Sequence, residues 1–545
     1  MKPRLRVVLF VLSLTLLNPA AISQSAVEAR LATGFNAISQ KNLRADLTFL
    51  ASDALEGRMS LQRGSEAAIQ FIAAEFAKAG LRPLVGDSYL QPIEMIEYKP
   101  DVRGMRLTLE RGSSQQQYKY IADFIGSFPL ETTVNSPVVF AGYGITAPEF
   151  GYDDYASVDA RGRIVLVFDH EPQENDPKSV FNGIGNTRHA NSRLKVLNAQ
   201  KHGALGVLMV SEPNRKHPSS QERLARIPGI MERMTRNASQ ALADSETKIP
   251  LLTVSDALAA TLLAPTGKKP AELQSAIDAA LRPQSQSLAD TRVEMRIVNA
   301  EHRRAMTANV IGMIEGSDPA LKNETIIFSG HYDHDGIREG KILYGADDNG
   351  SGTVGVIELA RAFAANPAKP KRSLLFAVFA AEERGLLGSY YYAAHPLRPL
   401  RETRVVINFD MIGRNEAPST QTDGLISIAA DTSNELNLIG TINSPDYRAA
   451  AERENQRVGL KLNYKWDDDA ALNVFQRSDQ FPFALHDIPA VWWFTGFHPD
   501  YHQPTDTVDR INFAKMEKIV RLAYLTGWSF ADSATTPRFV ARPLG

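Results

Sequence analysis

The sequence contains no cysteine. Disulfide bonds, thiol nucleophiles, a lipid-modified N-terminal cysteine and cysteine-ligated zinc are therefore excluded, and a transition metal would have to be held by His, Asp and Glu. Excess charge of either sign is also lacking, because 60 Lys and Arg face 62 Asp and Glu, a formal net charge of −2. A nucleic-acid binder normally carries a basic face or tail, so we expect no nucleic-acid partner.

Long apolar runs are the third absence. The longest, Val7–Leu17, is well short of the roughly 20 residues that a membrane-spanning helix needs. It follows basic residues at positions 2, 4 and 6 and precedes small residues up to Ser23, which is the pattern of a secretory signal peptide. We expect cleavage near Ser23, an exported protein in the periplasm or outside the cell, and no stable membrane anchor afterwards.

The 545 residues, 43% of them hydrophobic, are more than one core usually supports, so two or three domains are expected. Apolar residues at helical spacing between Ala68 and Phe76 predict an amphipathic helix, and residues 90–130 alternate as strands do. From residue 291 the pattern is apolar strand, loop and helix, repeated. This alternation predicts an α/β fold with a mostly parallel, doubly wound sheet.

Four short apolar runs in the C-terminal half lead directly into side chains that can bind metal. The runs TIIFSG, SLLFAVFAA, RVVINF and IPAVWWF precede, in order, His331, the pair Glu382 and Glu383, Asp410, and the histidines His498 and His502. The loop GADDNGSG adds Asp348. Since ligands bind beyond the carboxyl ends of strands in open α/β sheets, these residues are expected at one edge.

The segment GSGTVG, residues 350–355, also fits the dinucleotide fingerprint G-x-G-x-x-G. An acidic pair about 20 residues further on, as a ribose-binding acid would be, favours that alternative. Against it, Asp347 and Asp348 would repel a pyrophosphate, the preceding strand KILY is short, and the neighbouring histidines would have no role. The metal interpretation is preferred, with the glycines allowing a tight turn and close helix packing.

Each candidate ligand also has a purely structural explanation. A single His after a strand can be a hydrogen-bonded surface residue, the two glutamates can favour a helix N-terminus, and Asp348 can cap the helix that follows it. Asp410 lies between the apolar stretches VVINF and MIG and needs a strong partner. Five such residues at one edge are more specific than any one of them.

At these residues the chain resembles the co-catalytic di-zinc exopeptidases, a family that includes secreted bacterial aminopeptidases, glutamate carboxypeptidase and glutaminyl cyclases. The matching stretches, in order after LASDALEGR, are SGHYDH, GADDNGSG, AAEERGLLGS, NFDMIG, RSDQFPF and YHQPTDT. Between them, FAGYGI, KVLNAQKHGALGVLMV and IPLLTV resemble a β-rich protease-associated (PA) domain. With the expected signal peptide at 1–23, the resemblance implies a peptidase domain at 24–130 and 291–532, an inserted PA domain at 131–290 and a tail at 533–545.

The resemblance also implies a role for each residue. Two zinc ions per chain would share the carboxylate of Asp348. The residues completing the two sites would be, for one ion, His331 and Asp410 and, for the other, Glu383 and His502. Glu382 would be the general acid and base, and Asp333 would accept the second ring N–H of His331. His334 and His498 have no ligand role in this scheme.

The implied function is that of a secreted zinc exopeptidase, an aminopeptidase that removes N-terminal residues from peptide substrates. Glu382 would act as base on a hydroxide-forming water between the two metals. The alternative is a glutamate-carboxypeptidase-type enzyme, whose substrate carboxylate Arg384, Arg414 or Arg477 could bind. Glutaminyl cyclases use one zinc, and a non-catalytic receptor on this scaffold would be expected to lack ligands or the base. Oligomeric state is not indicated.

Overall fold

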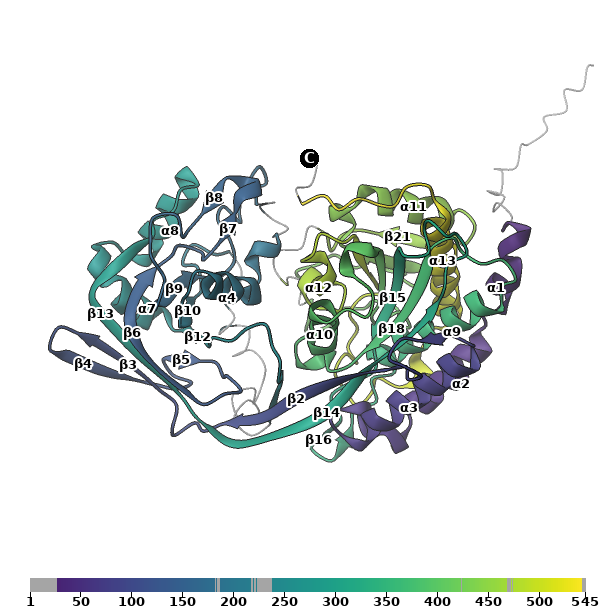
Figure 1. Cartoon of the computed structure of the whole chain (residues 1–545), viewed down its shortest axis with the longest axis horizontal. Helices are drawn as coiled ribbons and strands as arrows, with labels where there is room; N and C mark the ends of the chain where they lie inside the picture. The colour runs from purple at the N-terminus through teal and green to yellow at the C-terminus, as the bar shows by residue number, and fades with distance from the viewer. Residues whose placement is uncertain are drawn as a thin grey trace, which may run out of the picture.

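The computed structural model describes residues 27–541 except 182, 184–186, 217–218, 220–221, 223–237, 423, 468–471 and 473. The expected signal peptide, residues 1–23, lies outside this part of the chain. Among the described helices, none has the length and apolar character needed to cross a membrane. The chain forms two bodies, which Figure 1 shows side by side with the long strands β2 and β14 running between them. Each body is built around its own sheet.

The larger sheet has ten strands, nine of them in one path. In spatial order these are β11 (Ser239–Leu242), β2 (Leu90–Pro100), β14 (Asn299–Ile314), β18 (Ser373–Phe379), β15 (Thr325–His331), β19 (Thr403–Phe409), β22 (Ala490–Phe494), β20 (Glu435–Ile439) and β21 (Lys461–Asn463), while β1 (Arg82–Pro83) pairs with β14. The four central strands, β18, β15, β19 and β22, are parallel as predicted. The strands that flank them, β14 and β20, are antiparallel, so the sheet as a whole is mixed rather than mostly parallel.

Helices cover both faces of the larger sheet, which confirms the predicted α/β fold. Ile326 and Phe328 of β15 pack into one apolar core, and Ile327 between them points into the other. The first core includes α1 (Ala32–Ala37), α2 (Gln40–Leu50), α3 (Arg63–Lys78), α9 (Gly352–Ala365), α11 (Pro445–Asn455) and α13 (Phe513–Asp532). The second includes α10 (Leu387–Ala394) and α12 (Phe481–Ala484). The predicted apolar stripe of α3, from Ala68 to Phe76, faces the first core.

The smaller sheet has eight strands and lies on the left in Figure 1. Its order is β4 (Ser114–Lys119), β3 (Arg106–Arg111), β13 (Gln286–Ile297), β6 (Thr132–Phe140), β9 (Ile164–Phe168), β10 (Gly206–Val210), β12 (Leu251–Val254) and β5 (Phe124–Ile125). Its helices are α4 (Ser192–Lys201), α7 (Asp256–Leu263) and α8 (Pro270–Ala280). The parallel trio β6, β9 and β10 matches three of the predicted strands.

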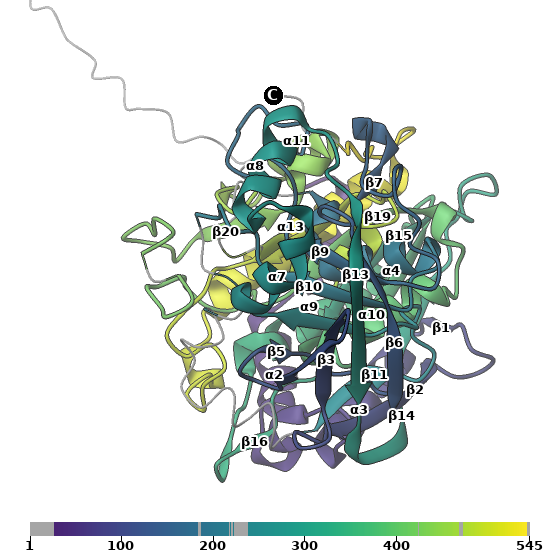
Figure 2. The same ribbon diagram turned by 90° about the vertical axis from the view of Figure 1, so that its left-hand side faces the viewer.

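The two sheets meet where β13 passes into β14 with only Val298 between them (Figure 1). Figure 2 turns the smaller sheet toward the viewer, with β3, β13 and β6 side by side. The expected domain boundaries at 131 and 290 differ from these pairings. Residues 106–125 and 291–297 belong to the smaller sheet, and β11, from within the expected insert, joins the edge of the larger one. Strand alternation alone does not reveal which distant partner a strand will pair with.

Candidate metal centre

The candidate ligands converge because three neighbouring parallel strands end level with one another. His331, the last residue of β15, is in register with Phe379, the last residue of β18. Asp410 directly follows β19, and Glu382 begins the short turn Glu382–Arg384 after β18. Three carboxyl ends therefore present their side chains at one edge, as the sequence predicted.

The inner part of the site surrounds Nε2 of His331, which is 1% exposed. Carboxylate oxygens lie 3.5 Å away on Asp410, 3.6 Å away on Glu382 and 3.7 Å away on Asp348. Nδ1 of His331 lies 3.2 Å from the carbonyl oxygen of Asp333, so the ring donates there and Nε2 is the nitrogen that can bind a metal once its proton is displaced. This nitrogen is buried without a hydrogen-bond partner among the described residues.

The outer part surrounds His502, whose side chain is 26% exposed and marks the open side of the site. Its Nε2 lies 3.0 Å from Oδ2 of Asp348 and 3.5 Å from Oε2 of Glu383. Its Nδ1 lies 3.0 Å from Asp335, a carboxylate that can only accept, so Nε2 is the nitrogen that can bind a metal once its proton is displaced. Asp335 is a functional residue that the sequence argument missed, although it stands four residues after His331.

Asp348 joins the two parts, because its Oδ1 faces His331 and its Oδ2 faces His502. Zinc bonds of about 2.1 Å in tetrahedral geometry place neighbouring ligand atoms about 3.4 Å apart. The separations of 3.0–3.7 Å around the two histidines match that spacing. The donor set thus fits two cations that share one carboxylate.

His334, which the resemblance placed outside the ligand set, lies within the site. Its Nδ1 donates to Oε1 of Glu383 at 2.8 Å, and Asp348 is 3.9 Å away. The three residues form one of the groups whose donor atoms could hold an ion together. His498, by contrast, faces the buried Asp347 at 3.3 Å and takes no part in these groups of the described chain.

Asp333 differs from its expected role. The nearest acceptor for His331 is the carbonyl of Asp333, whereas its carboxylate Oδ1 is 3.7 Å away. The carboxylate instead accepts the backbone N–H groups of Glu382, at 3.0 Å, and Glu383, at 3.3 Å, and the hydroxyl of Ser60. Because backbone donors adjoin it, Asp333 fixes the turn that carries both glutamates rather than the tautomer of the histidine.

Burial and like charges set the protonation of the inner part. Burial disfavours the His331 cation, but the charges of Glu382 and Asp410 outweigh it and raise the pKa of His331 well above its usual value. Burial raises the pKa of Glu382 well above its ordinary range and also raises the pKa of Asp410. The metal-free site therefore retains protons that a cation would displace.

Burial and neighbouring charges also set the protonation of the outer part, where they raise the pKa of His502 but lower that of Asp348. Burial opposes the His502 cation, yet Glu383 and other neighbours raise its pKa well above the usual value. Burial would raise the pKa of Asp348, but hydrogen bonding to His502 and the charge of His334 lower it overall. Asp348 is therefore an anion at neutral pH, as a bridging ligand must be.

The glycines of GSGTVG bring helix α9 against strand β19. A Cβ at Gly352 would lie 2.4 Å from the carbonyl oxygen of Phe409, and one at Gly355 would lie 2.9 Å from the ring of the same residue. The preceding segment KILY contributes only the two-residue strand β17 (Lys341–Ile342), paired in a hairpin with β16 (Ile337–Arg338). The close contacts match the packing interpretation of the motif. The two-residue strand β17 is much shorter than the strand that a dinucleotide loop follows.

Arg58 holds the ligand loops from behind. Its guanidinium is fully buried and donates to the carbonyl oxygens of Leu50, Tyr332, Tyr344 and Gly345 at 2.7–2.8 Å. Burial lowers the pKa of Arg58 to about 10, so it stays charged at neutral pH. Tyr332 follows the first ligand, and Gly345 opens the loop of the bridging carboxylate. Residue 58 is thus the anchor supplied by the segment LASDALEGR.

We expect Arg58→Lys to weaken both folding and zinc binding, because one ammonium cannot reach four carbonyl groups. Each carbonyl left buried and unsatisfied costs about 1–3 kcal/mol. Arg372→Lys is the matched control, since Arg372 is also buried and donates to the carbonyls of Phe530 and Ser533 far from the site. Denaturant unfolding should detect both changes, and zinc titration only the first. Equal zinc affinity in the two variants would refute this role for Arg58.

Two segments of the chain match models of known protein families. Residues 309–526, which contain all five candidate ligands, match the model of peptidase family M28, and residues 134–262 match the model of the PA domain. The chain carries an M28 peptidase domain and a PA domain. The M28 match covers the central strands β15, β18, β19 and β22 and helix α9.

Individual curated relatives are similar over part of the chain. Leucine aminopeptidase 2 of Arthroderma otae is 28% identical over 40% of this chain and 44% of that protein. Aminopeptidase YwaD of Bacillus subtilis is 27% identical over 43% of this chain and 47% of that protein. The chain thus spans about half the length of these relatives. Among solved structures, an aminopeptidase from Aneurinibacillus sp. strain AM-1 is 20% identical with a TM-score of 0.48, over 95% of this chain and 99% of that one.

Proposed function

We propose that this protein is a secreted zinc-dependent exopeptidase that acts as an aminopeptidase on peptide substrates. The observation that carries the proposal is the bridging position of Asp348 between Nε2 of His331 and Nε2 of His502. The match to peptidase family M28 over the ligand-bearing segment supports it, as do relatives named aminopeptidases. Export is supported by the signal-peptide pattern of residues 1–23.

The proposed ligands divide between two zinc ions that share the carboxylate of Asp348. One ion would be held by His331 and Asp410, and the other by Glu383 and His502. A bound zinc pair supplies Lewis acidity for the scissile carbonyl and lowers the pKa of water. The hydroxyl of Ser478 donates to Oδ2 of Asp410 at 2.5 Å and holds that ligand in place.

Glu382 is proposed to move the proton. Its carboxylate is buried beside His331. Its backbone N–H donates to Oδ1 of Asp333, which fixes the position of the backbone that carries the side chain. It would take a proton from the attacking water and return it to the departing amine. Burial, which raises the pKa of Glu382, makes it a stronger base than an exposed carboxylate.

The arginines that a carboxypeptidase could use are engaged in other contacts. Arg384 pairs with Asp335 at 3.3 Å, and Arg414 pairs with Asp500 at 2.7 Å. Arg477 lies over the ring of Phe497, 5.4 Å from its centroid. A guanidinium already bound to a carboxylate is a poor receptor for a substrate carboxylate, so Arg384 and Arg414 give little support to the carboxypeptidase alternative.

The test is hydrolysis of aminoacyl-p-nitroanilides by the purified protein before and after chelation. We expect activity to vanish in chelated protein and to return with zinc, and peptides with a blocked amine to resist hydrolysis. Activity in metal-free protein would defeat the metal mechanism. Hydrolysis of amine-blocked peptides from the carboxyl end would instead establish the carboxypeptidase alternative.

Zinc uptake should release protons. Because neighbouring carboxylates raise the pKa values of His331 and His502 well above their usual value in the metal-free site, both histidines hold protons near neutrality that zinc must displace. Apparent zinc affinity should therefore fall as pH falls below neutrality. Titration calorimetry in buffers of different ionisation enthalpy measures the released protons directly. Binding that is independent of buffer and pH would contradict the proposed protonation.

A further inference from the structure

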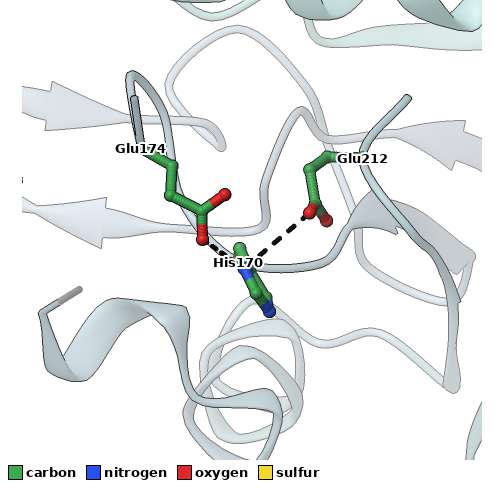
Figure 3. A group of neighbouring side chains, drawn as sticks. All are labelled: His170, Glu174 and Glu212. Atoms are coloured by element: carbon green, nitrogen blue, oxygen red, sulfur yellow. Dashed lines mark hydrogen bonds and ion pairs between the residues drawn. The ribbon is translucent and has the colours of Figure 1, made fainter. Parts of the chain in front are cut away.

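A second group of metal-binding side chains lies in the smaller body, far along the chain from the M28 ligands. His170, Glu174 and Glu212 are buried, at 3%, 7% and 2% exposure, and their donor atoms lie within 4.8 Å of one another. Figure 3 shows the imidazole between the two carboxylates, with Nδ1 of His170 2.5 Å from Glu174 and 3.7 Å from Glu212. The proposed peptidase mechanism uses none of these residues.

The position of the group follows the rule that placed the M28 ligands. Strands β9 and β10 are parallel neighbours whose last residues, Phe168 and Val210, are in register. His170 stands two residues beyond the end of β9, and Glu212 stands two residues beyond the end of β10. Glu174 lies four residues after His170 in the same loop, and its carboxylate contacts the imidazole of His170. The carboxyl ends of parallel strands thus present ligands at this edge as well.

The backbone around the histidine is held independently of the carboxylates. The ammonium of buried Lys195 donates to the carbonyl oxygens of His170 and Tyr143 at 2.5 and 2.6 Å. The N–H of His170 donates to the side chain of Asp169 at 2.9 Å. The ring is therefore aimed at the two glutamates by contacts that a bound ion would leave in place.

Among the described residues at this edge, buried carboxylates outnumber buried ammonium groups. Besides the two glutamates, Asp154 and Glu171 are buried near Lys195, which supplies a buried positive charge. A divalent cation held by the imidazole and the two glutamates would bring further positive charge to these carboxylates.

We propose that His170, Glu174 and Glu212 form a third metal site, which binds a zinc-type divalent cation and clamps the loops after β9 and β10. One imidazole nitrogen with two carboxylate oxygens suits zinc, whereas calcium and magnesium prefer oxygen alone. The separation of 3.7 Å already matches the edge of about 3.4 Å in a tetrahedral site. The 2.5 Å contact, now a hydrogen bond, would open as the ion replaces the shared proton.

The experiment counts zinc per chain by elemental analysis in the full-length mature protein, equilibrated in zinc buffer. We expect three equivalents in the wild type, two in the double variant E174Q/E212Q, and three in the control E171Q. Glu171 is a matched control because it is buried in the same loop but accepts from Thr187. Peptidase activity should persist in the double variant, which separates this site from the proposed catalytic one.

Wild-type protein that holds two equivalents, or a double variant that keeps the third, would overturn the proposal. If the double variant fails to fold, the wild-type count still decides, together with thermal unfolding: zinc added beyond two equivalents should raise Tm. Displacement of the third equivalent by millimolar calcium would overturn the assignment to a zinc-type cation. Loss of activity on chelation concerns the other site and leaves this count unaffected.

Discussion

Glu382→Gln should lower kcat by about a hundredfold or more while the protein keeps its zinc. Glutamine preserves the size of the side chain and its place beside His331 but cannot accept the proton of the attacking water. KM should change little, because the loss falls on proton transfer. Steady-state kinetics with an aminoacyl-p-nitroanilide, paired with elemental zinc analysis, measures both quantities on one preparation.

The adjacent glutamate supplies the control. Glu383 faces His502 at 3.5 Å and His334 at 2.8 Å, so Glu383→Gln should lose or weaken one zinc ion. The comparison is needed because Glu382 also lies within ligand distance of His331 and Asp410. If the first variant loses zinc and the second keeps it, the two glutamates have exchanged roles and the proposed base is wrong.

Asp348→Asn should have a still larger effect, because it removes the shared ligand of both ions. An amide offers one neutral oxygen and one N–H donor in place of two anionic oxygens, so it cannot face both histidines as an acceptor. Zinc content should fall by at least one equivalent at the M28 site. Metal catalysis contributes several kcal/mol, and at about 1.4 kcal/mol per tenfold its loss lowers kcat by about 10³ or more.

Asp347→Asn is the matched control for this substitution. Asp347 is the preceding residue and is also buried, but its carboxylate accepts from the backbone of Gly413 at 2.6 Å and from Ser351. An asparagine oxygen can keep the first of these bonds, so both zinc ions should remain. If the two variants lose zinc equally, the effect comes from disturbing the loop and the bridging role of Asp348 fails.

Part of the site was predictable from sequence because His331, Glu383 and Asp410 stand at or just beyond the ends of apolar runs. His331 ends a buried strand and Asp410 directly follows one, and short continuous apolar runs mark such strands in the sequence. Asp335 and His334 were missed because they lie in the loop after the strand, where no periodicity indicates side-chain direction. Asp506, which accepts the backbone N–H groups of both loop aspartates, belongs to the same class.

The boundary between the two bodies was predicted less well for a different reason. Strands β3, β4 and β5 have ordinary strand patterns, which predict that they are strands but not which sheet they join. Strand β3 joins the smaller sheet by pairing with β13, about 180 residues further along the chain at Arg111 and Thr291. Strand β4 joins through β3, and β5 joins by pairing with β12. The third metal group was missed similarly, because His170 and Glu212 meet only through the pairing of β9 with β10.

The sequence by itself determined the chemistry available to this protein. Without cysteine, only imidazoles and carboxylates can bind a transition metal, and the order of apolar runs placed them after parallel strands. The tertiary structure alone decided which atom faces which: the two oxygens of Asp348 toward two histidines, the carboxylate of Asp333 toward a backbone turn, and Arg384 and Arg414 toward acidic partners. Local patterns encode burial, whereas these contacts join segments far apart in the chain and exist only once the sheets have assembled.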